Sequence, residues 1–271
     1  MNIKSLGLYD SGVGGISILT SLRQAYPKLS ITYLADQEIM PLGEKSRDYI
    51  RERLQNASEH LFERDCPLVI LACNTASVMA IRYLQQTWIK AKYRGTHNVL
   101  GINKPLMEGM VERYAYLRGR KGMLISTSAT YDSGYYQNEL DERGFYHVQA
   151  VSSSDLASAI EAGDESRVKA SVERAIAKLK VPREEIEFII LACTHYPFAT
   201  AQIKSFFKPN VEIIEPGPLA ANKFGDYMYR HQEYVINDGP VTYLTTGDAP
   251  DFEKKVKILT GEKITAEHVR I

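Results

Sequence analysis

The feature that most constrains the fold of this chain is a series of short apolar runs without polar–apolar alternation. The clearest are residues 68–72 (Leu-Val-Ile-Leu-Ala) and residues 188–192 (Phe-Ile-Ile-Leu-Ala). Such runs are typical of strands buried on both faces, as in a parallel sheet covered by helices. Segments of helical length and period separate nearly all of them. This alternation predicts an α/β fold.

The expected elements follow one another without a low-complexity segment or an evident linker. One helix is expected after residues 10–15 and runs to about residue 25, with Pro27 closing the helical pattern. A second is expected over residues 44–63. Strands are expected at residues 3–9, 31–35, 68–72, 99–102, 123–126, 147–151, 186–192, 211–214 and 241–245.

Charge and cysteine content exclude several classes of protein. The 33 basic and 33 acidic residues give zero net charge without a basic run, so nothing points to nucleic acid or anionic lipid. The three cysteines lack CxxC spacing, which argues against a disulfide framework and a structural zinc site. The first residues do not read as a signal peptide, and no apolar run is long enough to cross a bilayer. We therefore expect a cytoplasmic protein with free thiols.

An internal similarity links two of the predicted strands. Residues 68–75 resemble residues 189–195, and each segment ends an apolar run with a cysteine, Cys73 or Cys193, followed by polar residues. The similarity predicts two similar α/β halves that each present one cysteine at the carboxyl end of a strand. Open α/β sheets bind ligands at that edge.

A thiol between a strand and a helix lies near a helix N-terminus, which favours the thiolate and can lower the thiol pKa from about 8.5. Free cysteines are also often buried and inert. The matching polar neighbours at 74–75 and 194–195 favour function for Cys73 and Cys193. Cys66 has no polar companions and is interpreted as structural.

Two facing thiols are compatible with three chemistries. One is a disulfide switch. A second is a metal site formed by Cys73, Cys193 and His195, although these residues lack the spacing of a metal motif. The third is two-base proton transfer, in which one thiolate removes a proton and the opposite thiol returns one from the other face. Racemisation of an amino acid without a cofactor requires such a pair, and identical residues suit a mirror-image substrate and product.

The loop at residues 10–15 (Asp-Ser-Gly-Val-Gly-Gly) follows the first predicted strand. Asp10 either serves the site, by accepting a proton from a substrate ammonium or by holding a thiol, or caps the next helix, as Ser11 could. The loop N–H groups could bind a carboxylate or phosphate. As a dinucleotide motif the loop fails at Ser17, although Asp36 stands where a ribose-binding acid would. His195, next to a candidate thiolate, is a plausible proton partner.

Together these motifs resemble the glutamate racemases of bacterial cell-wall synthesis, nearly from end to end. The resemblance lies in residues 10–15, 41–43, 46–47, 72–76, 193–197 and 243–248. It implies two similar three-layer α/β domains with mostly parallel sheets and an active site in the interdomain cleft. It implies interconversion of L- and D-glutamate without cofactor or metal, to supply D-glutamate for peptidoglycan. A homodimer is also implied.

The resemblance also assigns roles to residues. The two catalytic cysteines are Cys73, for the D-enantiomer, and Cys193, for the L-enantiomer. Asp10, His195 and Glu161 assist them. The substrate is held by Asp10, Ser11, Gly43, Asn74, Thr75, Thr194 and His195. The first domain would comprise residues 1–99 with 210–271, and the second residues 100–209.

Several positions depart from the family pattern. Leu42 stands where the family usually has Tyr, Lys104 where it has Glu, and Pro216 where it has Ser. Residues 126–130 replace a Gly-Thr-x-Gly-Thr stretch. These departures leave aspartate or another acidic amino acid as alternative substrates. They also leave open a divergent protein-binding module, because some racemases of this family bind DNA gyrase.

Overall fold

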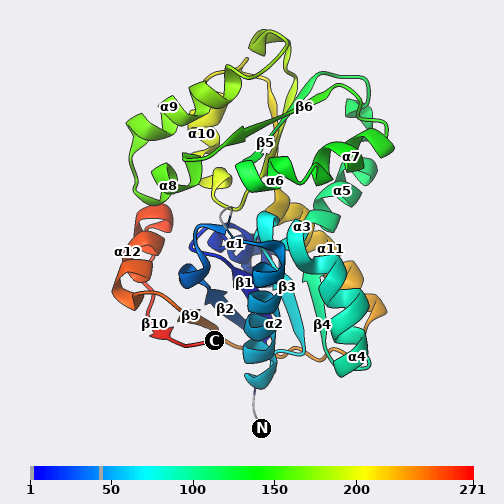
Figure 1. Ribbon diagram of the computed structural model, residues 1–271, viewed down its shortest axis with the longest axis vertical. Helices are drawn as coiled ribbons and strands as arrows, with labels where there is room; N and C mark the ends of the chain where they lie inside the picture. The colour runs from blue at the N-terminus through cyan, green and yellow to red at the C-terminus, as the bar shows by residue number, and fades with distance from the viewer. Residues whose placement is uncertain (1–2, 43–44) are drawn as a thin grey trace.

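The computed structural model describes residues 3–42 and 45–271, which form two lobes with one β-sheet each (Figure 1). The first sheet has six strands in the order β10-β9-β2-β1-β3-β4, and the second has four in the order β6-β5-β7-β8. Every pairing between these strands is parallel. The α/β fold predicted from the sequence, with two mostly parallel sheets, is therefore confirmed.

The strands coincide with the apolar runs. Those of the first sheet are β1 (Leu6–Asp10), β2 (Ile31–Ala35), β3 (Leu68–Leu71), β4 (Asn98–Gly101), β9 (Val241–Thr245) and β10 (Ala266–His268). Those of the second are β5 (Gly122–Thr127), β6 (Val148–Ser153), β7 (Phe188–Ala192) and β8 (Glu212–Ile214). All residues of β1, β2, β3 and β7 are buried, as expected for strands covered on both faces. Only β10 was not predicted, because this short edge strand has no apolar run.

Helices cover both faces of each sheet and create four apolar clusters. The longer helices around the first sheet are α1 (Ile16–Ala25), α2 (Arg47–Glu63), α3 (Asn74–Tyr83), α11 (Pro216–Arg230) and α12 (Ala249–Thr260). Those around the second are α5 (Asn103–Glu112), α6 (Ser128–Asp132), α7 (Tyr135–Glu142), α8 (Leu156–Glu161), α9 (Glu165–Ile176) and α10 (Thr200–Lys204). Each domain thus has three layers. Within the described residues, none of the helices is both long and apolar enough to span a membrane.

The two domains share one topology. The order β2-β1-β3-β4 in the first sheet matches the order β6-β5-β7-β8 in the second, both in sequence order and in parallel sense. The third strand of each domain, β3 or β7, leads into a cysteine. The internal similarity in the sequence therefore reflects two structurally similar halves.

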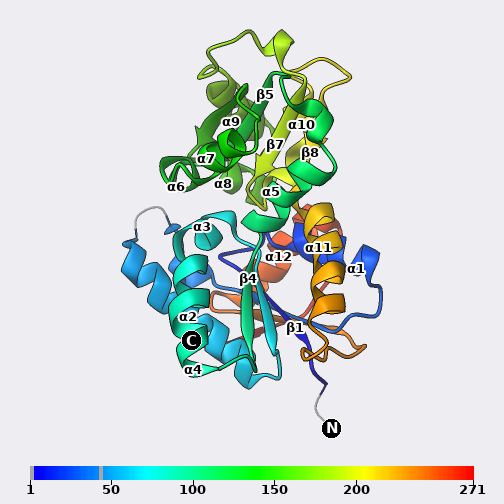
Figure 2. The ribbon, with the colours of Figure 1, turned by 90° about the vertical axis from the view of Figure 1, so that its right-hand side faces the viewer.

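The chain passes between the lobes twice, after β4 into α5 and after β8 into α11, and these helices lie beside the junction (Figure 2). The predicted domain limits, between residues 99 and 100 and between residues 209 and 210, lie close to both crossings. β4 continues to Gly101 in the first sheet, and β8 pairs with β7 in the second. We therefore place the second domain at residues 102–214, because hydrogen bonding between strands, rather than chain position, decides which sheet a segment joins.

Candidate active site

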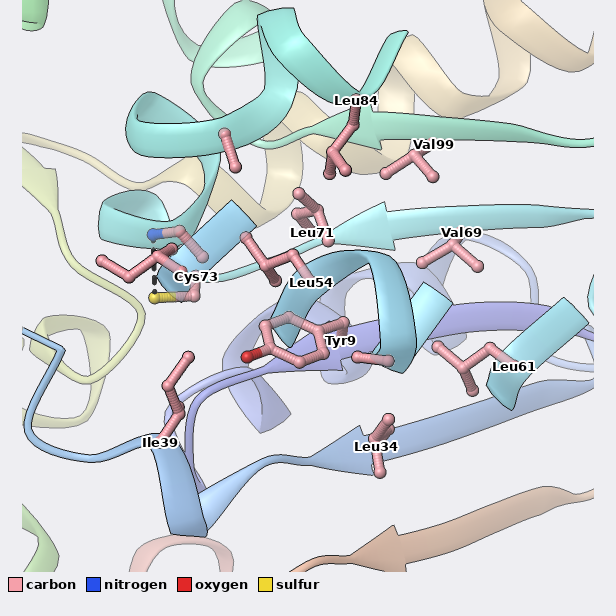
Figure 3. Packing of buried hydrophobic residues seen from close by; sticks show 14 of the residues in the cluster. Tyr9, Leu34, Ile39, Leu54, Leu61, Val69, Leu71, Cys73, Leu84 and Val99 are labelled. Atoms are coloured by element: carbon pink, nitrogen blue, oxygen red, sulfur yellow. Dashed lines mark hydrogen bonds between the residues drawn. The ribbon is translucent and has the colours of Figure 1, made fainter. Parts of the chain in front are cut away.

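Two cysteines lie after the equivalent strands β3 and β7, close to the contact between the domains. Cys73 is the N-cap of α3, and its Sγ accepts a hydrogen bond from the backbone N–H of Ala76 at 3.5 Å (Figure 3). Cys193 directly follows β7. The two side chains are only 7% and 6% exposed, and a charge on Cys193 affects the pKa of Cys73. Both thiols are thus nearly buried, and Asp10 lies near each of them: its charge affects the pKa of Cys73, and it accepts a hydrogen bond from Thr194, the residue after Cys193.

The Cys73 thiol is held in its neutral form. Burial raises the pKa of Cys73 to about 12, and the negative charge of Asp10 adds to the shift. Hydrogen bonds from Ser11 Oγ, at 3.4 Å, and from Ala76 oppose it. The prediction that the helix N-terminus lowers the thiol pKa is therefore wrong for Cys73. The free energy needed to remove a thiolate from water exceeds the stabilisation that the partial positive charge at the helix N-terminus provides.

Cys193 is paired with a histidine and a carboxylate. His195 Nδ1 lies 3.8 Å from Cys193 Sγ, and His195 Nε2 lies 2.7 Å from Glu161 Oε1. Burial disfavours a charged imidazole, but the contacts with Cys193 and Glu161 outweigh it and raise the pKa of His195 to about 10. Burial likewise opposes the Glu161 carboxylate, yet His195 brings the pKa of Glu161 below its ordinary value. This side of the site therefore favours a protonated His195 between Cys193 and Glu161.

Asp10 connects the two domains. Its side chain is fully buried, and its Oδ2 accepts a hydrogen bond from Thr194 Oγ1 at 3.1 Å while Oδ1 accepts from the N–H of Gly12 at 3.0 Å. Burial raises the pKa of Asp10 to about 6, although the charge of His195 and these two donors oppose the shift. Gly15 is the N-cap of α1, and no side chain caps that helix. Asp10 is thus not the N-cap residue of α1, although its carboxyl also interacts with the backbone of Gly15 at the start of that helix.

The loop that follows β1 lies directly against the cysteine turn of the second domain. A Cβ on Gly14 would lie 2.4 Å from His195 Nδ1 and 2.5 Å from Thr194 Oγ1, so only glycine allows this approach. Ser17 Oγ also donates a hydrogen bond across the interface to the Thr194 carbonyl at 2.8 Å. The glycines of this loop thus permit close contact between domains.

Polar side chains from both domains surround the start of α3. Thr75 Oγ1 lies 3.0 Å from Thr127 Oγ1 and 2.9 Å from Thr130 Oγ1, both of which belong to the second domain. The Tyr136 hydroxyl donates to Asn74 Oδ1, while the buried Asn74 Nδ2 has no hydrogen-bond partner among the described residues. The arrangement offers hydroxyls and a free amide donor, which are suitable groups for a carboxylate.

The other residues singled out in the sequence lie elsewhere or are already paired. Gly43 lies outside the described residues. Cys66 is buried in the core, as predicted. Asp36 is buried and forms two hydrogen bonds with Arg53, so it is not available to a ribose. Across residues 3–42 and 45–271, no group of three or more His, Cys, Asp or Glu residues could hold a metal ion, so the alternative of a metal site with His195 finds no support.

The positions that depart from the family pattern lie mainly in the core or at the domain junction. Leu42 is buried in the same apolar cluster as Cys73. Lys104, at the start of α5, is largely exposed and lies 3.6 Å from Glu108. Pro216 is the first residue of α11. Of these positions, only Leu42 is packed in the same cluster as a candidate catalytic residue.

Four polar residues of this region were not assigned to the site from the sequence: Thr127, Thr130, Tyr136 and Lys255. Of these, Thr127 and Thr130 belong to the stretch 126–130 that departs from the family pattern. Thr127 ends β5, which is equivalent to β1 in the shared topology, and Asp10 ends β1. The internal similarity could therefore have pointed to Thr127. No sequence pattern connects Lys255, on α12, with Glu161, although their side chains lie 3.5 Å apart.

Comparison with known proteins agrees with this geometry. Residues 98–224 match the family described as Asp/Glu/Hydantoin racemase. The chain is 33% identical over 273 residues to the glutamate racemase of Jannaschia sp. strain CCS1, covering 98% of this chain and 99% of that one. The glutamate racemase of Cereibacter sphaeroides strain ATCC 17025 is 32% identical, covering 97% and 99%.

Solved structures give the same result. The glutamate racemase RacE1 of Bacillus anthracis superposes with a TM-score of 0.85 at 26% identity and covers 99% of this chain and 98% of that one. The glutamate racemase of Thermus thermophilus in complex with β-chloro-D-alanine has a TM-score of 0.78 at 25% identity, covering 98% and 96%. Nearly full-length similarity, a shared fold and paired cysteines after equivalent strands lead to one conclusion: the chain belongs to the family of aspartate and glutamate racemases.

Proposed function

We propose that this protein is a cofactor-independent glutamate racemase in which Cys73 and Cys193 transfer the α-proton. The observation that carries the proposal is the pair of nearly buried thiols after the equivalent strands β3 and β7. The relatives that match this chain over nearly its full length are named glutamate racemase, which supports glutamate as the substrate. The product, D-glutamate, would enter peptidoglycan synthesis.

In the direction from L- to D-glutamate, the Cys193 thiolate takes the α-proton. The C–H bond breaks, its electron pair remains on the substrate, and the Cys73 thiol donates its own proton to the opposite face of the α-carbon. In the reverse direction the two sulfurs exchange roles. The site regains its starting charge after protons redistribute among the two thiols and their partners, so no oxidant or reductant is needed.

The Cys193 side carries its own proton partner. An imidazolium on His195 next to Sγ stabilises the thiolate electrostatically, and Glu161 holds the imidazole from its other nitrogen. The arrangement resembles other nucleophile or base sites in which a carboxylate orients a histidine.

The Cys73 side requires the substrate for its activation. The Asp10 carboxylate opposes ionisation of Cys73, and its two known donors leave it able to accept further hydrogen bonds. A substrate ammonium bound at Asp10 compensates that negative charge and lowers the thiol pKa of Cys73. Ionisation of this thiol is therefore coupled to substrate binding.

The carboxylates of the substrate are assigned to the polar cluster at the start of α3. The unpaired Nδ2 of Asn74 and the hydroxyls of Thr75, Thr127 and Thr130 are suitable donors. Ser11, Gly43 and Thr194, which the family resemblance also assigns to the substrate, complete the proposed binding set. Both thiols are more than nine-tenths buried. We infer that substrate enters when the domains separate.

The test is incubation of the purified, reduced protein with L-glutamate, D-glutamate and both aspartates in D₂O, with loss of the α-proton followed by NMR alongside optical rotation. Exchange with inversion of glutamate supports the proposal. Exchange of aspartate alone would show that aspartate, not glutamate, is the substrate. If a folded protein with reduced thiols exchanges the α-proton of none of the four amino acids, the proposal is refuted.

Single substitutions test the role of each thiol. Cys73→Ser and Cys193→Ser should each lower racemisation at least about 100-fold, because each removes the acid or base on one face of the substrate. Cys66→Ser is the matched control, since Cys66 is also buried but precedes β3, whereas Cys73 follows the opposite end of that strand. Near-normal racemisation by either of the first two variants would contradict the two-thiol mechanism.

Two further properties follow from the family and remain proposals. A cytoplasmic location suits a mechanism that needs reduced thiols, and Cys66, Cys73 and Cys193 are all free. A homodimer is inferred from the resemblance alone, and light scattering after size-exclusion chromatography tests it.

A further inference from the structure

A chain of charged side chains runs from the proposed active site to the surface and crosses the domain boundary. His195 contacts Glu161, whose Oε2 lies 3.5 Å from Lys255 Nζ, and Lys255 lies 2.9 Å from Asp251 Oδ2. His195 and Glu161 belong to the second domain. Lys255 and Asp251 lie one turn apart on α12, which follows β9 of the first sheet. The contact between Lys255 and Glu161 therefore joins the two domains.

The packing of α12 against α8 places this contact next to the site. Figure 1 shows α12 directly below α8, and a Cβ on Gly163 would lie 3.1 Å from Ile258 Cγ2. The Glu161 side chain is 20% exposed and that of Lys255 is 26% exposed. The pair is thus partly shielded from solvent, unlike the surface ion pairs of this protein, many of which are about half exposed.

We propose that Lys255 is a positioning residue for the Cys193 half of the reaction, which holds the Glu161 carboxylate against His195 when the domains are closed. The proposal rests on the proposed racemase function. Lys255 itself reaches neither thiol in the contacts described. Its ammonium binds one carboxylate oxygen of Glu161 while the imidazole binds the other, so the carboxylate is held from both sides.

The consequence is electrostatic. Burial opposes the charge on Glu161, whereas His195 and Lys255 favour it and together lower its pKa. Four other ionisable groups act on this cluster: Asp10 from β1, Tyr33 from β2, Asp251 from α12, and Cys193, which follows β7. Asp251 loses its partner when Lys255 is replaced, but as an acid it cannot take over the favourable charge that Lys255 supplies to Glu161. Loss of Lys255 should therefore raise the pKa of Glu161 and loosen its hold on the imidazole.

The first measurement does not require turnover. The titration of the Glu161 carboxyl is followed by ¹³C NMR and assigned with Glu161→Gln. In Lys255→Met its midpoint should rise by about half a pH unit, the size expected of a partly exposed ion pair. Lys255→Arg keeps the cation and should restore the wild-type titration. Lys254→Met, an exposed neighbour on the same helix, is the matched control and should leave it in place.

The second measurement tests catalysis. Because L- and D-glutamate have equal free energies, kcat/KM must be the same in both directions, so the deuterium isotope effect of each α-deuterated enantiomer identifies the affected step. Lys255→Met should lower kcat/KM about threefold, shift the acidic limb of its pH profile upward, and raise the isotope effect more for L- than for D-glutamate. A purely structural loss would lower the yield of active enzyme without changing either signature.

The outcomes are distinguishable. An unchanged Glu161 titration in Lys255→Met would overturn the positioning role, as would an unchanged pH profile and isotope effect in an active enzyme. If the wild-type protein exchanges no α-proton, the proposed function fails. The NMR titration then still decides whether Lys255 holds Glu161.

Discussion

Replacement of Asp10 by Asn should make the protein more stable at alkaline pH while it removes activity. Asp10 is fully buried, and its pKa is raised from 3.8 to about 6, chiefly by burial. Because the folded-state pKa lies above that of the unfolded chain, the folded protein binds this proton more tightly. The resulting stabilisation is complete below pH 3.8 and is lost as the pH rises through about 6.

The shift gives the magnitude. A difference of about two pH units corresponds to about 3 kcal/mol of unfolding free energy that the wild-type protein loses between about pH 4 and pH 7. Asn carries no charge to desolvate, but its amide group faces two donors, Thr194 and Gly12, and can accept from only one of them. With about 1 kcal/mol deducted for the lost hydrogen bond, Asp10→Asn should be about 2 kcal/mol more stable at pH 8. At pH 4 it should be no more stable than wild type.

The assay is urea denaturation followed by circular dichroism at several pH values between 4 and 8. Asp226→Asn serves as control, because the Asp226 side chain is 66% exposed and its nearest ion-pair partner, Lys223, is 3.9 Å away. That variant should keep the wild-type pH dependence. In parallel, Asp10→Asn should lose at least about 100-fold in racemisation, since it no longer compensates a substrate ammonium. A variant that is less stable at pH 8, or whose stability still falls between pH 4 and 7 as in wild type, would refute the reasoning.

Two further predictions concern packing and a buried ion pair. Gly14→Ala should fold but racemise at least about tenfold more slowly, because its Cβ would lie 2.4 Å from His195 Nδ1 and force the domains apart. Circular dichroism tests the folding and the D₂O exchange assay tests the rate. Full activity would contradict the prediction. Arg53→Met leaves the fully buried Asp36 without its guanidinium and should lower the unfolding free energy by about 3 kcal/mol. Urea denaturation measures the loss, and an unchanged midpoint would show that the pair does not stabilise the fold.

The sequence was sufficient to predict most of the elements and to propose the paired cysteines of the candidate site. Strands such as residues 68–71 and 188–192 are buried on both faces, so their composition alone identifies them. A cysteine after such a strand must lie at its carboxyl end, and the repeat of that pattern at Cys73 and Cys193 predicted the paired site. The edge strand at residues 266–268 escaped prediction, because an edge strand needs no apolar run.

Contacts between distant residues were decided by the tertiary structure. No local pattern indicates that Thr75 meets Thr127 or that Lys255 meets Glu161 across the domain boundary. The ionisation of Cys73 was also predicted with the wrong sign. The helix N-terminus that favours its thiolate is a local feature visible in the sequence, whereas the burial that outweighs it comes from both domains and exists only once they are packed together.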